Sequence, residues 1–289
     1  DTFQVDFWGE TGFVWADVFP QVKSTMLVTL WAFVGIEGAV VLSSRARHKK
    51  DVGRATVIGL IGTLLIYMMI SIFSFGVMTQ EQLAALPEPS MAYVLEAVVG
   101  PFGATLINIG LLVSLTGALL GWTILATEIS YVASRDGVFP KVFHRLNANE
   151  TPVNALFITQ AFTQVVTAIA LFSEQTYLVL SSIAGIAALV PYLFSALYGW
   201  MEAKRTTSLR MMVVSGIASL YAAWLLYASG VEYVLIAMIL YAPGIFVFLL
   251  AEREQGRPFL TRTQSLIALI ILLCATYGIY GLWTATIAL

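Results

Sequence analysis

The sequence predicts an all-α integral membrane protein with eight transmembrane helices. Of its 289 residues, 59% are hydrophobic and 11% are charged, and the mean hydropathy is +0.85. An ordinary soluble domain carries about 25% charged residues, so this chain is too apolar for a water-exposed surface. Its apolar residues also gather in runs of about 20 residues, the length that crosses a bilayer. Backbone polar groups in lipid must be bonded within the chain, which makes these runs helices.

Polar loops separate the eight apolar runs. The third run is longer than an upright crossing needs, so we expect it to tilt or to extend into the cytoplasm. The predicted spans are residues 24–44, 55–77, 101–133, 153–172, 177–200, 211–229, 232–250 and 264–287.

Basic residues assign the two sides of the membrane. If the spans alternate, fourteen of the fifteen Lys and Arg residues fall on one side, and the exception is Lys23. Cytoplasmic loops are enriched in Lys and Arg, so that side is cytoplasmic. The acidic loop 78–100 then lies outside, together with the N-terminal segment 1–22 and the C-terminus. The cytoplasmic loops are 45–54, 134–152, 201–210 and 251–263.

Composition argues against several other classes of protein. The net charge of −2 gives no basic excess that would point to nucleic acid. The single cysteine, Cys274, lies in an apolar run, which leaves no disulfide framework and no Cys-based metal site. No nucleophile–base pair supports an enzyme, and no cofactor is expected. The chain begins with Asp1 rather than Met, so we expect an N-terminal portion of the protein to be missing.

Glu37 is one of two acidic residues in the interior of the predicted spans. It lies near the middle of the first span, between Gly35 and Gly38. A glycine in a helix interior costs about 1 kcal/mol relative to Ala, so two glycines around an intramembrane acid predict an interrupted helix. Transporters use such breaks at the bilayer midplane to present backbone groups to substrates. Close helix packing, with Glu37 bonded to a neighbour, is the structural alternative.

Glu128 is the other acid, and it lies near the cytoplasmic end of the third span. An ionisable residue within the membrane is a functional hypothesis by default. Three roles stay open for Glu128: direct coupling to transport, pairing with a cytoplasmic Arg or Lys, or a polar contact in an inner vestibule.

Two tryptophans, Trp31 and Trp122, lie away from the predicted membrane edges. Interfacial belts account for most membrane tryptophans, so these two need another explanation. An aromatic wall for a substrate is one, because an aromatic face attracts a cationic side chain by roughly 0.5–2 kcal/mol. Core packing is the other.

Small residues and a proline mark two further positions. Gly117 and Gly121 form a G-x-x-x-G pair, which favours close approach of another helix. Pro191 is predicted to interrupt and bend the fifth span, which would expose the hydroxyl of Tyr192 to a cavity. A purely structural kink is the alternative.

At these residues the sequence resembles the amino acid–polyamine–organocation (APC) superfamily. Within it, the sequence is most similar to the basic amino-acid and polyamine antiporters of the arginine–ornithine, arginine–agmatine and lysine type. The motifs follow one another in family order and spacing. They are residues 21–31 with 35–38, residues 121–123 with Glu128 and 135–140, residues 149–152, and residues 181–182 with 189–193.

The resemblance implies a LeuT-like 5+5 transporter fold, with two inverted five-helix repeats and trailing helices. Residues 23–200 would be the second repeat, with a broken first helix, and residues 201–289 would add three trailing helices. The first repeat would be missing, and the family's site is built between both repeats. Residues 43–51 lack the Asn-Pro turn of the wider superfamily. The eighth span implies thirteen helices in the complete protein and an outside C-terminus.

The resemblance also implies a function. The complete protein would be a multi-pass antiporter of the cell (inner or plasma) membrane that exchanges cationic amino acids or polyamines. Its partners would be these substrates, the lipid bilayer and the missing N-terminal helices, with a homodimer left open.

The same resemblance assigns roles to single residues. Backbone carbonyls near Val34 and Gly35 would hold the substrate's α-amino group, and Trp31 and Trp122 would wall its side chain. Glu37 would be a substrate-contacting gate that responds to protons. Tyr192 would supply an inner-gate hydroxyl, and Glu128 is grouped with the gating residues.

Two other functions stay open. A proton-coupled amino-acid symporter on the same fold would show net uptake without an internal counter-substrate. A non-transporting subunit of an ion-translocating complex usually shows Lys, His and Glu along a row of spans, whereas only two acids lie in the interior of the spans here.

Overall fold

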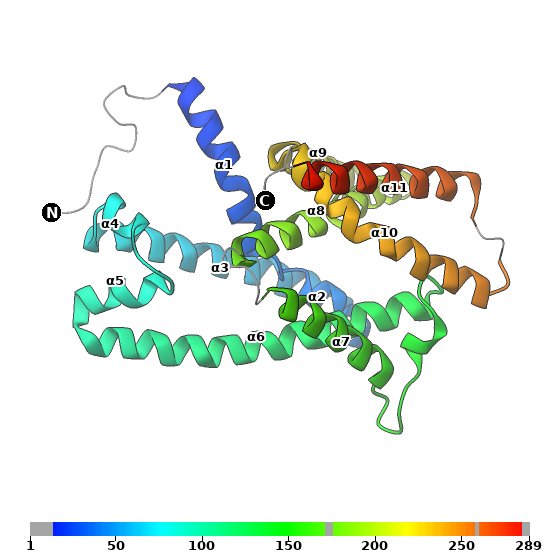
Figure 1. The fold of residues 1–289 in the computed structure, drawn as a ribbon, viewed down its shortest axis with the longest axis horizontal. Helices are drawn as coiled ribbons and strands as arrows, with labels where there is room; N and C mark the ends of the chain where they lie inside the picture. The colour runs from blue at the N-terminus through cyan, green and yellow to red at the C-terminus, as the bar shows by residue number, and fades with distance from the viewer. Residues whose placement is uncertain (1–13, 171–175, 258–259, 285–289) are drawn as a thin grey trace. The chain divides into compact units, whose positions relative to one another are not determined.

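The computed structural model describes residues 14–170, 176–257 and 260–284. Within these ranges the chain forms α-helices and short 3-10 turns, without a β-strand (Figure 1). The all-α prediction is confirmed for this part of the chain. The predictions for residues 1–13 of the N-terminal segment, and for the C-terminus at 285–289, lie outside the described residues.

Six of the helices in the described residues are long and apolar enough to cross a membrane, judged by length and composition. They are α3 (Lys49–Val77), α6 (Pro101–Arg135), α8 (Thr176–Arg205, from Ala184 on), α9 (Leu209–Ser229), α10 (Val231–Glu254) and α11 (Arg262–Trp283). The other two predicted spans correspond to α7 (Val153–Ala170) and to the broken pair α1 (Trp15–Phe33) and α2 (Gly38–Val41), which lie outside this group.

The length of α6 agrees with the long third apolar run. The helix has 35 residues, which at a rise of 1.5 Å per residue gives about 50 Å. The hydrocarbon core is about 30 Å thick. The helix must therefore tilt strongly or extend beyond the core.

The predicted loop 78–100 contains two short helices, α4 (Gln80–Ala84) and α5 (Ser90–Val99), which both contact α3. A capping box between Thr79 and Gln82 begins α4. The chain then turns sharply from α5 into α6. A Cβ on Gly103 would lie 2.5 Å from the carbonyl oxygen of Leu95, so only glycine fits this close approach.

The described helices fall into two compact units. One unit contains Gly35–Glu128, which covers α2, the 3-10 turn η1 (Ser43–Arg45), α3, α4, α5 and most of α6. The other contains α1 from Ala16 on, the end of α6, the turn η2 (Lys141–His144) and α7 to α11. The chain passes between the units at Val34 and Gly35, inside the first predicted span.

In the second unit, α8 packs along α9 and α10 packs along α11, while α10 also contacts α8. Ile186 and Leu189 of α8 are fully buried. The first helix lies against α9, because the Phe19 and Trp224 rings meet edge to face at 5.4 Å. Lys23 Nζ lies 5.2 Å from the centre of the Tyr227 ring. The helix α1 begins at Trp15, upstream of the predicted start at residue 24.

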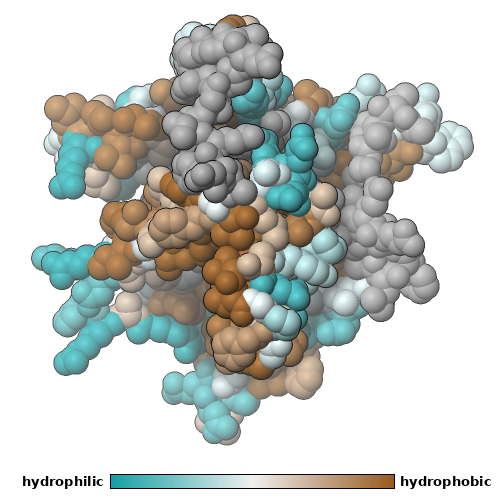
Figure 2. All heavy atoms as spheres, turned by 90° about the vertical axis from the view of Figure 1, so that its left-hand side faces the viewer, coloured by the Kyte–Doolittle hydropathy of each residue, from teal (hydrophilic) through white to brown (hydrophobic). Residues whose placement is uncertain are grey.

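Apolar side chains cover much of the surface. Figure 2 shows many hydrophobic side chains exposed on the face that it presents, beside hydrophilic ones. The most apolar windows of α3 and α6 are 0% buried within the structure. Soluble monomers rarely expose apolar patches of more than a few hundred Å², so these helix faces are suited to lipid or to further helices.

Candidate functional site

The first predicted span is broken at the glycine pair. The helix α1 ends at Phe33, residues 34–37 form a turn, and α2 begins at Gly38. Gly35 has φ +112°, a conformation that residues with a Cβ rarely adopt. Gly38 has a different role, because a Cβ there would lie 3.4 Å from Cδ1 of Leu125. One glycine allows the turn, and the other allows α2 to approach α6.

The break exposes backbone hydrogen-bonding groups. The amide of Val34 still donates to Leu30 (3.1 Å), and that of Gly38 donates to the Gly35 carbonyl (3.0 Å). The Glu37 carboxylate accepts from the Gly35 amide at 2.8 Å, so it bonds to the turn itself. Within the described residues no hydrogen bond reaches the carbonyl oxygens of Ala32 and Val34. These oxygens are therefore available to a ligand with N–H donors.

Three contacts fix the segment 35–45 to one face of α6. A Cβ on Gly35 would lie 3.3 Å from Cζ2 of the Trp122 indole. Gly38 lies against Leu125, one helical turn further along. The third contact is to Glu128. Positions 122, 125 and 128 follow at intervals of three and share a helix face. The segment 35–45 and Trp122 are thus parts of one local structure within the first unit.

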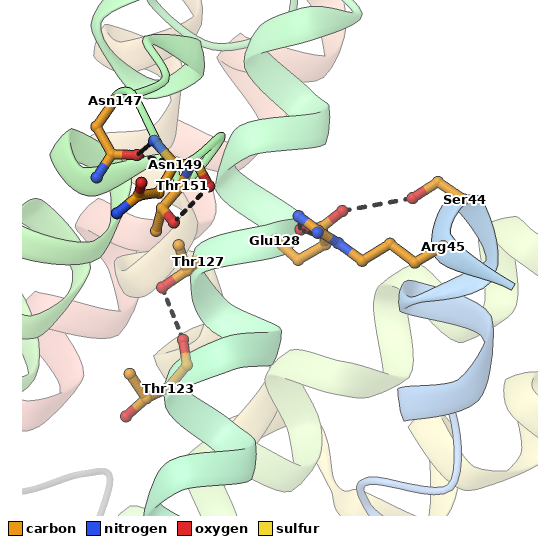
Figure 3. A network of polar contacts seen from close by, with 8 residues as sticks. All are labelled: Ser44, Arg45, Thr123, Thr127, Glu128, Asn147, Asn149 and Thr151. Atoms are coloured by element: carbon orange, nitrogen blue, oxygen red, sulfur yellow. Dashed lines mark hydrogen bonds and ion pairs between the residues drawn. The ribbon is translucent and has the colours of Figure 1, made fainter.

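Glu128 is held by an ion pair from the turn η1. Nη2 and Nε of Arg45 lie 2.8 and 3.2 Å from Oε2 of Glu128, and the Ser44 hydroxyl lies 3.4 Å from Oε1 (Figure 3). The Glu128 side chain is 4% exposed, whereas that of Arg45 is 57% exposed. Removing one partner of a buried pair leaves an uncompensated charge. Of the roles left open for Glu128, the structure shows pairing with a basic residue of the loop predicted to be cytoplasmic.

Trp31 and Tyr192 lie in the second unit. Trp31 is in the last turn of α1 and is 36% exposed, while Trp122 in the first unit is 46% exposed. Tyr192 is half-buried in α8, which continues through Pro191 to Arg205. The prediction that Pro191 interrupts the fifth span was therefore wrong. The first unit brings together Gly35, Glu37, Trp122 and Glu128, and the second contains Trp31, Val34 and Tyr192.

The sequence analysis missed the residue that compensates for this proline. Proline has no N–H, so Pro191 cannot donate to the carbonyl of Ala187 four residues earlier. The hydroxyl of Tyr241, in α10, donates to that carbonyl instead. Pro191 signals that Ala187 needs another donor, but no local pattern identifies a residue 54 positions away.

Two stretches that carry the family resemblance form loops of the second unit. The side-chain oxygen of Asn147 accepts from the amides of Asn149 and Thr151, at 2.9 Å each (Figure 3). In the other loop, the Gln255 side chain donates to the carbonyl of Gly137. Gly137 has φ +81°, and a Cβ there would meet the Gln255 amide at 2.6 Å. Both stretches therefore have a structural explanation.

A groove of about 740 Å³ follows one face of α6. Thr116, Gly117 and Thr123 are among its lining residues. Nothing in the described residues lies within 4 Å of a Cβ on Gly117 or Gly121, so their predicted close packing involves no described helix. The described residues also contain no group of three His, Cys, Asp or Glu side chains that could hold a metal ion.

Comparisons with known proteins point in one direction. The family described as amino acid permease matches residues 1–209. The chain is 42% identical over 303 residues to an arginine/ornithine antiporter of Pseudomonas aeruginosa, covering 100% of this chain and 63% of that protein. It is 41% identical over 238 residues to an arginine/agmatine antiporter of Chlamydia caviae, covering 78% and 49%. It is 35% identical over 311 residues to an L-lysine transport protein of Corynebacterium glutamicum, covering 100% and 62%.

These figures also concern length. The chain spans about three fifths of the Pseudomonas and Corynebacterium relatives. Those proteins therefore contain sequence to which nothing in this chain corresponds.

Proposed function

We propose that this chain, which belongs to the amino acid permease family, forms part of a secondary transporter exchanging cationic amino acids across a cell membrane. Arginine is the first candidate substrate, and ornithine, agmatine or lysine are the candidates for its exchange partner. The names of the three relatives support this choice. The observation that carries the proposal is the broken span, where Gly35 turns the chain directly beside the face of α6 that holds Trp122.

The proposed binding groups match the chemistry of such a substrate. An α-amino group needs hydrogen-bond acceptors, and the carbonyl of Val34 accepts no hydrogen bond within the described residues. Gly35 follows Val34 in the same turn and is proposed to contact the α-amino group with it. A guanidinium or ammonium side chain is attracted to an aromatic face, and Trp31 and Trp122 are both partly exposed. Glu37 adds a carboxylate that no ion pair reaches in the described residues.

Three residues are proposed to gate the path. Glu37 bonds to the turn through the Gly35 amide, so taking up a proton there would weaken that bond. Tyr192 is proposed as an inner-gate hydroxyl. Glu128 is proposed to act through Arg45, because their ion pair holds the segment after the break against α6. Release of substrate to the cytoplasm would require that segment to leave α6.

We extend the proposal to the fold of the complete protein. Eight spans of this chain would be the second five-helix repeat and three trailing helices of a LeuT-like fold, with the C-terminus outside. Helices of the first repeat would cover the groove along α6, where Gly117 and Gly121 leave space. The part of the Pseudomonas protein that this chain does not match would supply them, since this chain covers 63% of that protein.

Exchange in proteoliposomes tests the proposed function. Full-length protein carrying this sequence is reconstituted with internal ornithine, and uptake of labelled arginine is measured. We expect uptake that depends on the internal cation and stops when the vesicles are loaded with a neutral amino acid. Net uptake into empty vesicles, driven by a proton gradient, would instead identify a symporter. Absence of both would reject transport of cationic amino acids.

A further inference from the structure

Tyr241 makes an unusual contact between two of the long apolar helices. It lies near the middle of α10, and its hydroxyl donates a hydrogen bond to the main-chain carbonyl of Ala187 in α8. Hydroxyls of Ser and Thr often reach carbonyls of their own helix, as Thr116 does that of Leu112, but Tyr241 reaches a carbonyl of another helix. Inside a regular helix each carbonyl accepts from the amide four residues later. Here residue 191, which should provide that amide, is a proline.

The proline makes the Ala187 carbonyl unusual in two ways. Pro191 has no N–H to donate to that carbonyl, and a proline ring inside a helix crowds the carbonyl four residues earlier. In lipid an unbonded carbonyl costs several kcal/mol, and neighbouring helices commonly supply the missing donor. The Tyr241 hydroxyl is such a donor. The packing of α10 on α8 brings the two residues together.

This bond acts at the position where α8 changes its internal bonding. Ala187 lies before the proline, and Tyr192 lies directly after it. A proline, or a side chain that engages a carbonyl of the helical ladder, can change the course of a helix. The bond from Tyr241 therefore bears on the course of α8 at this point, and the position of Tyr192 follows from it.

We propose that Tyr241 is a positioning residue for Tyr192. By holding the carbonyl of Ala187, Tyr241 fixes the helix at Pro191 and thereby sets the position of the hydroxyl that follows it. A trailing helix, α10, thus controls a residue of the transport path without contacting the substrate. This inference rests on the proposed gating role of Tyr192.

A stability cycle in the full-length protein tests the hydrogen bond. Tyr241→Phe removes only the hydroxyl and should lower the melting temperature by about 2–4 °C. Pro191→Ala restores an amide that can donate to Ala187. In that background Tyr241→Phe should have no further effect, because the carbonyl then has its helical partner. Tyr277→Phe is the control, since the Tyr277 ring is 63% exposed on α11.

A transport cycle tests the positioning role. Tyr241→Phe should lower the maximal exchange rate by roughly three- to tenfold and leave the apparent KM within about twofold, a size typical of coupled residues. In a Tyr192→Phe background the same change should no longer affect the rate, although it should still lower the melting temperature. A merely structural role would lower both quantities in either background.

The two cycles separate the ways in which the idea can fail. Additive melting temperatures in the Pro191 cycle would overturn the hydrogen-bond link. Additive exchange rates in the Tyr192 cycle would overturn the positioning role while leaving the bond intact. A protein that exchanges no cationic amino acid would reject the proposed function and the gate with it, and the Pro191 cycle would still decide the bond.

Discussion

Arg45 and Glu128 stand 83 residues apart in the chain and form an ion pair at 2.8 Å, with the carboxylate almost fully buried. The guanidinium approaches one carboxylate oxygen with two nitrogens, and Ser44 approaches the other. Charge-assisted bonds of this kind are about twice as strong as neutral ones. They fix the end of the segment 35–45 at Arg45, and the other end of the segment lies against Trp122.

Replacing Glu128 with Gln should loosen this segment. The amide keeps the shape but removes the charge, so Arg45 loses its ionic partner. We expect a cysteine at Leu125, which lies under Gly38, to react roughly two- to tenfold faster with an impermeant thiol reagent on the cytoplasmic side. A cysteine at the exposed Thr206 is the control and should react at an unchanged rate. Equal rates for Leu125→Cys with and without Glu128→Gln would contradict the role of the ion pair.

Trp122→Ala should weaken binding of cationic substrates by roughly 1–2 kcal/mol, the range of a desolvated cation–π contact. Binding of labelled arginine to the full-length protein measures this change. Trp283→Ala is the control, because Trp283 is 84% exposed at the end of α11. Similar losses from both variants would indicate packing rather than recognition.

Gly35→Ala should lower the rate of exchange, whereas Gly53→Ala should not. The added Cβ is strained at φ +112° and meets the Trp122 ring at 3.3 Å, and unusual backbone conformations of this kind cost about 1–3 kcal/mol. We expect exchange to fall by at least about tenfold, the effect of 1.4 kcal/mol. Gly53→Ala in α3, where a Cβ meets open space, should be neutral or slightly stabilising. Normal exchange by Gly35→Ala would show that the turn can change without consequence.

Glu37→Gln should preserve folding but flatten the pH dependence of exchange. The amide oxygen can still accept from the Gly35 N–H, whereas the side chain can no longer take up a proton. Glu37→Asp, shorter by one methylene, should keep some pH dependence with altered rates. Exchange across about pH 5–8 measures both. Glu232→Gln, at the exposed start of α10, is the control. A Glu37→Gln variant with unchanged rates and pH profile would remove Glu37 from the mechanism.

Labelling of single cysteines tests the predicted sides of the membrane. Ala84→Cys, in the acidic loop, should react with an impermeant reagent in intact cells, because that loop contains no Lys or Arg. Thr206→Cys, beside Lys204 and Arg205, should react only after permeabilisation. The reverse labelling pattern would show that the chain crosses the membrane in the opposite orientation.

The sequence predicted the features that depend on local chemistry. Apolar runs gave the long helices, and the glycines at 35 and 38 marked the break, since positive φ and close approach both demand glycine. The T-x-x-Q pattern at Thr79 also indicates the start of α4, although no helix was predicted in the loop 78–100.

Contacts between distant segments could not be predicted in the same way. Arg45 was one of several basic residues in its loop, and nothing local distinguishes it as the partner of Glu128. An interruption at Pro191 was predicted, but α8 continues through it, and the donor to the Ala187 carbonyl comes from another helix. The sequence indicates which polar groups need a hydrogen-bonding or ionic partner. Which residue becomes that partner depends on how the helices pack.

The bond from Tyr241 has a consequence for how related chains should vary. Its acceptor is a main-chain oxygen, and every amino acid provides the same oxygen, so the residue type at position 187 carries no record of the contact. The contact is reflected instead at position 191, because Pro191 lacks the N–H that would donate to this oxygen and the Tyr241 hydroxyl donates in its place. Homologues that have another residue at 191 should be free to lose the tyrosine at 241. Covariation is therefore expected between 191 and 241, two positions that the bond does not directly join.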